Sequence, residues 1–166
     1  GSLALGEWDG AATARCAAAV ETLEAAGVRA WIPDSIWAEL WRKVSFVVVQ
    51  GALGAAANAP IGVLRSDLRD AFTRAVSEVV AVAAALGHDL ATDAAPDPVA
   101  EALRMADAQP AGATTSMQRD IAAGLPSELD ASSVPCAAPA TRLACRPPFS
   151  TSRTASWLRK RLQPGR

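Results

Sequence analysis

The stretch from residue 34 to residue 60, DSIWAELWRKVSFVVVQGALGAAANAP, constrains the fold of this chain most strongly, because it contains no proline before Pro60. At about 100° per residue, its large apolar side chains fall on one wide face of a helix. These residues are Ile36, Trp37, Leu40, Trp41, Val44, Val47 and Val48. Asp34 or Ser35 can cap the helix start. The pattern predicts one long helix whose apolar face needs other helices to cover it.

Two features of this helix suggest what surrounds it. Lys43 is expected at the edge of the apolar face, where its stem would pack on Ile36 and Val47 while its ammonium reaches past them. The alternative is an exposed ion pair with Glu39, four residues earlier. The two glycines at positions 51 and 54 would let another part of the chain approach the helix closely.

The flanking segments predict a mainly α fold that begins with a short α/β unit. Strands are expected at residues 3–5 and 28–32, with a helix at 11–26 between them. Later helices are expected at about 67–86, 99–108 and 117–123, the first of them capped by Ser66. We therefore divide the chain into an α/β segment (1–33), a helical domain (34–130) and an irregular tail (131–166).

Composition narrows the chemistry that the chain can perform. His88 is the only histidine, and we expect it to be solvated because it follows the helix stop at Gly87. The cysteines, at positions 16, 136 and 145, are odd in number and lack the spacing of a zinc site, so no metal is expected. Cys16 is read as a small buried residue, and the cysteine usage favours a reducing, cytoplasmic setting. No segment has the length and apolarity expected of a membrane span.

Charge is distributed unevenly along the chain. Residues 131–166 hold seven Lys or Arg and no Asp or Glu, whereas the first 130 residues hold nine basic and 17 acidic side chains. A basic tail can bind nucleic acid or acidic surfaces. Binding to nucleic acid is disfavoured because only Phe149 and Trp157 supply aromatic rings in the tail.

Ser116 and Glu128 surround a short predicted helix near the end of the helical domain. In the simplest interpretation Ser116 caps that helix, and Glu128 lies in the first turn of a following helix that Ser127 starts.

Three blocks carry a resemblance to a known family: LALGEWDG, then AAGVRAWIPDSIWAELWRKV, then SMQRDIAAGLPSELD. In this order, over about residues 3–130, the chain resembles ketopantoate reductase (2-dehydropantoate 2-reductase). The resemblance implies the helical C-terminal domain of a 6-phosphogluconate-dehydrogenase-like reductase, preceded by the end of a Rossmann domain. The family reduces ketopantoate to pantoate with NADPH, on the route to pantothenate.

The resemblance also implies roles for four residues. Lys43 would be the general acid that protonates the developing alkoxide. Glu128 would hydrogen-bond the substrate hydroxyl and help to hold Lys43, and Ser116 would bind the substrate carboxylate. Gln50 is a further candidate for substrate contact. It lies between Val47 and Gly51, positions where the family often has asparagine, so another 2-keto acid is a possible substrate.

A glycine-rich nucleotide motif, G-x-G-x-x-G after a strand, is missing from this sequence. GALGAA at 51–56 lies inside the predicted long helix instead. We therefore expect the chain alone to be inactive with NADPH, and its uncovered apolar helices to favour a homodimer. The alternative is a non-catalytic helical interaction module whose basic tail binds nucleic acid or acidic surfaces.

Two hypotheses account for the tail after Asp130. The family continues there with a helix, a GVxTP turn and an amphipathic helix. Back-translated into GC-rich codons and read two bases later, the tail can encode a GVPTP turn and an amphipathic end. A slip of the reading frame is therefore one hypothesis, and a functional basic tail is the other.

Overall fold

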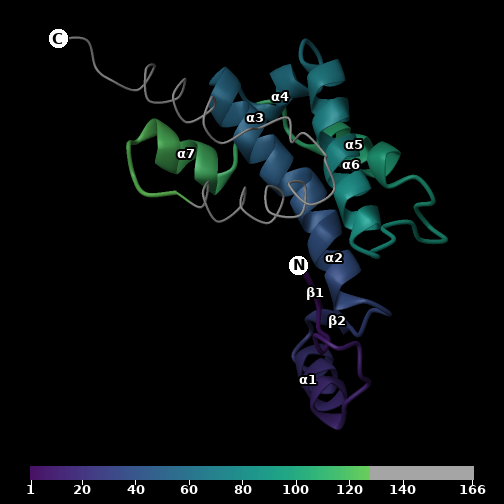
Figure 1. Ribbon diagram of the computed structural model, residues 1–166. Coiled ribbons are helices and arrows are strands. Elements are labelled where there is room, and N and C mark those ends of the chain that lie inside the picture. Colours follow the sequence, from purple (N-terminus) through teal and green to yellow (C-terminus); the bar gives the residue numbers. More distant parts are fainter. Residues whose placement is uncertain (128–166) are drawn as a thin grey trace.

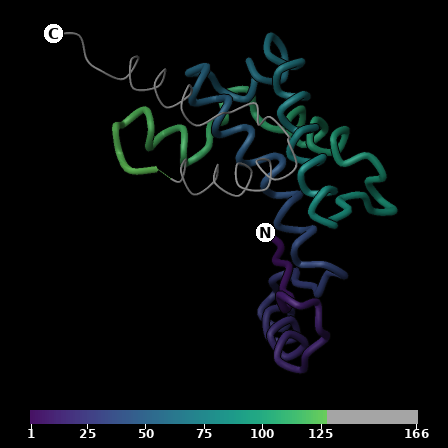
Figure 2. Tube along the Cα trace, in the orientation of Figure 1, coloured from purple at the N-terminus to yellow at the C-terminus, as the bar shows by residue number. Residues whose placement is uncertain are grey.

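The computed structural model describes residues 1–127 and is mainly helical (Figure 1). The α/β unit and the helices form two parts, joined through α2, as the Cα trace also shows (Figure 2). The elements are β1 (Ser2–Ala4), α1 (Ala14–Ala25), β2 (Arg29–Trp31), α2 (Ile36–Lys43), the π-helical turn η1 (Val44–Val48), α3 (Val49–Ala57), α4 (Ile61–Leu64), α5 (Arg69–Ala85), α6 (Pro98–Ala108) and α7 (Ser116–Ala122).

The N-terminal segment is the predicted α/β unit. β1 pairs with β2 in parallel, with Leu3 opposite Ala30, and α1 makes the connection between them. Thr13 caps α1 by accepting a hydrogen bond from the Cys16 N–H, so the helix starts three residues later than predicted. Cys16 is half-buried rather than buried, and no other residue of α1 is buried either.

The predicted long helix forms, but five residues in its middle are π-helical. Ser35 is the cap, since its hydroxyl accepts a hydrogen bond of 3.2 Å from the Ala38 N–H. Two residues predicted on the buried face are exposed, Trp37 in α2 at 41% and Val47 in the π-helical turn at 40%. Phe46, also in the turn, is buried.

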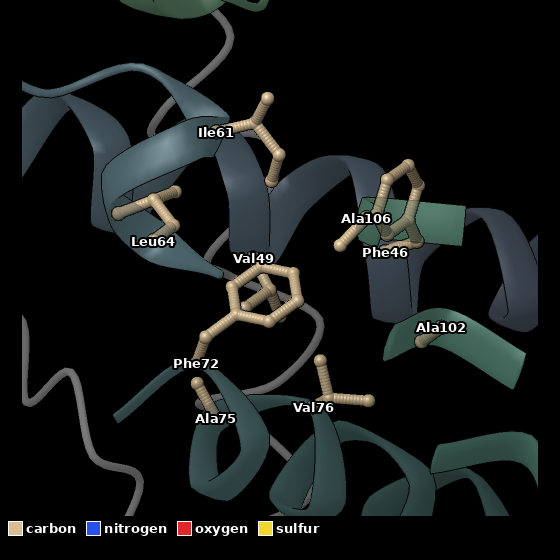
Figure 3. Packing of buried hydrophobic residues seen from close by; sticks show 9 residues of the cluster. All are labelled: Phe46, Val49, Ile61, Leu64, Phe72, Ala75, Val76, Ala102 and Ala106. Carbon is tan, nitrogen blue, oxygen red and sulfur yellow. The ribbon is translucent and has the colours of Figure 1, made fainter. Parts of the chain in front are cut away.

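The main hydrophobic core lies where η1, α3, α4, α5 and α6 meet (Figure 3). Phe46 and Phe72 make an edge-to-face contact with ring centroids 6.4 Å apart. Fully burying such a side chain contributes about 1.5–3 kcal/mol. The residues of this core are Phe46, Val49, Ile61, Leu64, Phe72, Ala75, Val76, Ala102 and Ala106.

The region after Pro60 differs from the prediction. The long helix ends at Ala57, before Pro60, with Asn58 in the left-handed conformation as its C-cap. Pro60 instead starts the short helix α4, which places Ile61 and Leu64 in the core. Ser66 does not cap α5, because its hydroxyl donates to the Gly62 carbonyl at 2.8 Å. Helix α5 therefore begins at Arg69, two residues later than predicted.

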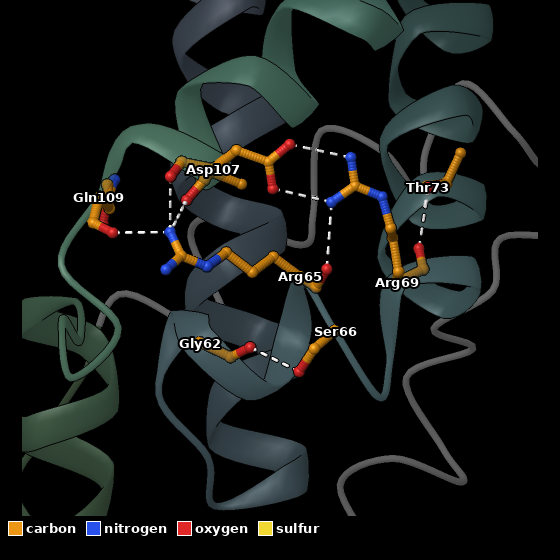
Figure 4. A network of polar contacts seen from close by, with 8 residues as sticks. Gly62, Arg65, Ser66, Arg69, Thr73, Asp107 and Gln109 are labelled. Carbon is orange, nitrogen blue, oxygen red and sulfur yellow. Dashed lines mark hydrogen bonds and ion pairs between the residues drawn. The ribbon is translucent and has the colours of Figure 1, made fainter.

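Two arginines bind the C-terminal end of α6 (Figure 4). The Nη1 atom of Arg65 donates to the carbonyls of Ala106, Asp107 and Gln109 at 3.0, 2.7 and 2.7 Å. Arg69 makes a two-pronged ion pair with the Asp107 carboxylate at 2.8 and 2.9 Å. Helix carbonyls at a C-terminus lack intrahelical partners, so these cations stabilise the helix end that leads to α7.

Candidate functional site

Lys43 is the last residue of α2 and lies on an exposed surface. The structure thus corrects the expectation that it is partly buried. The alternative ion pair with Glu39 is also wrong, because Glu39 pairs with Arg42 at 2.7 Å. Within residues 1–127, the Lys43 side chain makes no hydrogen bond or ion pair, so its ammonium is available for a ligand.

Gln50 lies on the same helical stretch but points into the protein. Its side chain is 3% exposed, and its amide exchanges hydrogen bonds with that of Gln109 at 3.2 and 3.4 Å. Contact between Gln50 and a substrate would require this amide pair to open. The exposed position one turn after Lys43 is taken by Val47.

Ser116 is the first residue of α7 and is exposed. It does not cap the helix, because Thr115 does: the Thr115 hydroxyl accepts from the Gln118 N–H at 3.2 Å, and Gln118 Oε1 accepts from the Thr115 N–H at 3.0 Å. This capping box was readable as Thr115-x-x-Gln118. In the described part of the chain, the Ser116 hydroxyl has no hydrogen-bond partner.

The glycines of α3 receive α7, as predicted for a close approach at this place. A Cβ on Gly51 would lie 2.3 Å from Met117 Cε and 3.0 Å from the Thr115 hydroxyl. Gln118 lies against Gly54 and donates from Nε2 to the Ala59 carbonyl at 3.0 Å. Ser116 lies between the two residues that contact position 51, Thr115 and Met117, and its own side chain is exposed.

Glu128, the fourth residue in this set, and the whole basic tail lie outside the described residues. Two candidates therefore lie on helices that pack together: Lys43 on the α2–α3 stretch and Ser116 on α7. Each has an exposed polar group without a hydrogen-bond partner in residues 1–127. Gln50, in contrast, is buried in its pair with Gln109.

An aromatic row that the sequence reading missed joins the α/β unit to the helices. Trp8 and Trp37 have ring centroids 4.9 Å apart, and the Trp37 Nε1–H donates to the Trp8 carbonyl at 3.0 Å. Trp37 also stacks on His88 at 5.9 Å with an interplanar angle of 18°. His88 is therefore half-buried in this row rather than solvated, because the ring of Trp37 covers one face.

Glu7 organises the polar contacts of the α/β unit. Its carboxylate accepts hydrogen bonds from Arg15, with Nε at 2.5 Å, and from the Thr13 hydroxyl at 2.6 Å. These donors favour the ionised form and lower the pKa of Glu7 to about 2, with Arg15 as the largest cause. The contacts tie the loop after β1 to the first turn of α1.

Two classes of site find no support in residues 1–127. This region contains no group of three or more His, Cys, Asp or Glu side chains placed to hold a metal ion. It also contains no helix that is long and apolar enough to cross a membrane.

Comparison with known proteins identifies the family to which this fold belongs. Residues 35–149 match the family described as Ketopantoate reductase PanE/ApbA C terminal. No curated protein matches the chain.

Three solved structures are similar in fold. The 2-dehydropantoate 2-reductase from Methylococcus capsulatus has 23% identity and a TM-score of 0.81, covering 98% of this chain and 52% of its own. A PanE/ApbA family ketopantoate reductase from Ralstonia eutropha JMP134 has 27% identity and a TM-score of 0.73, covering 92% and 51%. The dimeric ketopantoate reductase from Staphylococcus aureus has 17% identity and a TM-score of 0.74, covering 92% and 52%. The present chain spans about half the length of each.

Proposed function

The chain belongs to the ketopantoate reductase C-terminal family, and from this premise we propose that it forms the helical half of an active site that reduces a 2-keto acid. The observation that carries the proposal is the docking of α7 on the glycines of α3. This packing brings Ser116 to the helix that carries Lys43, and both side chains are exposed with unused polar groups.

In this proposal Lys43 and Ser116 divide the work on the substrate. The Lys43 ammonium donates a proton to the keto oxygen as negative charge develops there. The Ser116 hydroxyl donates a hydrogen bond to the substrate carboxylate and so fixes its orientation. Glu128, outside the described residues, would accept a hydrogen bond from the substrate hydroxyl and hold Lys43.

The substrate that the family implies is ketopantoate, in the pathway to pantothenate. Val47 places an apolar side chain one turn after Lys43, which favours a 2-keto acid that makes an apolar contact there. Gln50 would take part only after its amide pair with Gln109 opens.

NADPH is the reductant that the family implies, and it would supply the hydride. Residues 1–127 do not fit it, because the glycines of GALGAA are covered by Met117 and Gln118 and cannot receive a phosphate. We propose that nucleotide binding lies outside these residues and that residues 1–127 alone do not reduce substrate. Support for a homodimer comes from the dimeric relative of S. aureus. A cytoplasmic location remains a prediction from the cysteine usage.

Substrate binding can be tested on the whole chain because it contains only two lysines, Lys43 and Lys160. In a Lys160→Arg variant labelled with ¹⁵N-lysine, the single side-chain signal reports on Lys43. We expect ketopantoate to shift this signal, and Ser116→Ala to weaken binding about tenfold, equal to the loss of one charge-assisted hydrogen bond. Ser77→Ala, on α5, is the control. An unshifted Lys43 signal at saturating ketopantoate would rule out the proposed site.

Catalysis can be tested by complementation. The N-terminal half of the M. capsulatus enzyme is supplied separately, and NADPH oxidation is followed with ketopantoate. We expect Lys43→Ala to reduce the rate by about 10²-fold or more, the usual contribution of a general acid. Equal rates for Lys43→Ala and the parent chain would exclude Lys43 from that role.

A further inference from the structure

The π-helical turn η1 begins directly after Lys43 and changes the phase of the helix. In an uninterrupted α-helix, residues 43, 47, 50 and 54 share one face. In the structure residues 43 and 47 are exposed, whereas residues 50 and 54 are buried. A π-helical turn holds one extra residue, which rotates all that follows by about 100°.

This rotation decides what α3 presents to its neighbours. It turns Gln50 to Gln109 and the glycines at 51 and 54 to Met117 and Gln118. Without it, Gln50 would lie on the face of Lys43. The extra residue thus allows one continuous helical stretch to expose an amine and also to dock α7.

Ser45 is the polar side chain inside this turn. It is 3% exposed, and its hydroxyl donates to the Arg42 carbonyl at 2.8 Å. Hydroxyls that bond to a carbonyl of the preceding turn bend helices and provide partners where the regular ladder is altered. Arg42 is held in turn, since its Nε donates to the Leu90 carbonyl at 2.9 Å. Arg42, the residue before Lys43, is therefore held through both its backbone carbonyl and its side chain.

We propose that the π-helical turn, held by the Ser45 hydroxyl, is the positioning element that sets the direction of Lys43 relative to α7 and Ser116. Ser45 is buried beneath the exposed face and acts through the backbone before Lys43. The inference rests on the proposed role of Lys43. It adds that this role depends on the length of the segment Val44–Val48.

A deletion tests the length directly. Removing Val47, an exposed residue, should convert η1 into regular helix and rotate Lys43 by about 100° relative to α3. In the Lys160→Arg, ¹⁵N-lysine background, we expect the deletion to weaken the ketopantoate response of Lys43 at least about tenfold, as misplaced catalytic groups do. Val47→Ala keeps the length and removes only the apolar contact proposed above, so it should weaken the response far less than the deletion does. A folded deletion variant whose response is no weaker than that of Val47→Ala overturns the inference.

A second measurement needs no ligand and therefore separates this inference from the proposed function. Lys43 and residue 51 are eight residues apart, about 12 Å along a helix. The two neighbours of Ser116 in sequence, Thr115 and Met117, both contact position 51. A spin label on Ser116→Cys, with the three native cysteines replaced by serine, should broaden the Lys43 signal. Deletion of Val47 should remove most of this broadening. Equal broadening in a folded deletion variant overturns the inference even if ketopantoate does not bind.

Should the deletion variant fail to fold, Ser45→Ala decides the question. It removes only the hydroxyl, and we expect a weaker ketopantoate response and altered broadening, both restored by Ser45→Thr. A folded Ser45→Ala variant that matches the parent in both measurements contradicts the role of Ser45 and of the turn that it holds.

Discussion

Gly54 and Gln118 lie so close together that a Cβ on residue 54 would be 2.2 Å from Nε2 of Gln118. Gln118 cannot move aside freely, because its amide donates to the Ala59 carbonyl and accepts from the Thr115 N–H. The absence of a side chain at residue 54 therefore allows α7 to dock on α3 and to carry Ser116 to its place.

Gly54→Ala is expected to destabilise the protein. Overpacking costs about 1–3 kcal/mol, and the better helix propensity of alanine returns about 1 kcal/mol, so the free energy of unfolding should fall by up to about 2 kcal/mol. Urea unfolding followed by circular dichroism measures the change. Gly112→Ala is the control, because a Cβ there meets nothing within 4 Å. Equal stability of the two variants would contradict the close docking.

Arg65 should contribute more to stability than Arg69, although both bind the end of α6. Arg65 is half-buried and bonds three carbonyls, so Arg65→Ala should cost about 1.5–3 kcal/mol. Arg69 and Asp107 form an exposed ion pair, so Arg69→Ala should cost less than about 1 kcal/mol. Thermal unfolding of the two variants side by side compares their stabilities. A larger loss of stability for Arg69→Ala would contradict the greater contribution of Arg65 to the contacts in Figure 4.

Glu7 should make the α/β unit sensitive to acid. Its pKa is lowered from 4.5 to about 2 in the folded protein, so its contribution to stability is complete above 4.5 and is lost as pH falls towards 2. Glu7→Gln should flatten the pH dependence of unfolding in this window. Glu24→Gln, an exposed position on α1, is the control. Unfolding curves of Glu7→Gln that keep the parent's acid dependence would show that the Arg15 and Thr13 contacts do not hold in solution.

Glu78, in contrast to Glu7, should destabilise the folded protein when its carboxyl is ionised. Burial raises the pKa of this half-buried carboxyl on α5, which has no hydrogen-bond partner within residues 1–127. Its ionised form is therefore disfavoured by folding, and the penalty is present above the raised pKa and disappears as the group is protonated. Glu78→Gln should raise the melting temperature at about pH 8 and have little effect at about pH 4. A lower melting temperature at the higher pH would show that the charge has a partner.

Several parts of the fold could be predicted because their signals are local. The α/β unit and the helix that ends before Gly87 follow from periodicity and stop residues. The close approach at Gly51 and Gly54 followed from the absence of side chains. The error at Ser116 was also local, since Thr115 and Gln118 form the capping box one residue earlier.

Other parts depend on residues that are far apart in the chain. Gln50 pairs with Gln109, 59 residues later, and Trp37 contacts both Trp8 and His88. The start of α4 at Ile61 depends on a core that also contains Phe72 and Ala106. Local propensity carries no information about such pairs.

The sequence by itself determined that a long amphipathic helix follows a short α/β unit, and that an amine lies on this helix. These features depend on the turn of about 100° per residue and on the residues that start and stop helices. Only the tertiary structure decided which way the amine points. In the π-helical turn after Lys43, Phe46 is buried against Phe72 of α5, 26 residues later, so the face that the turn exposes depends on contacts between distant parts of the chain.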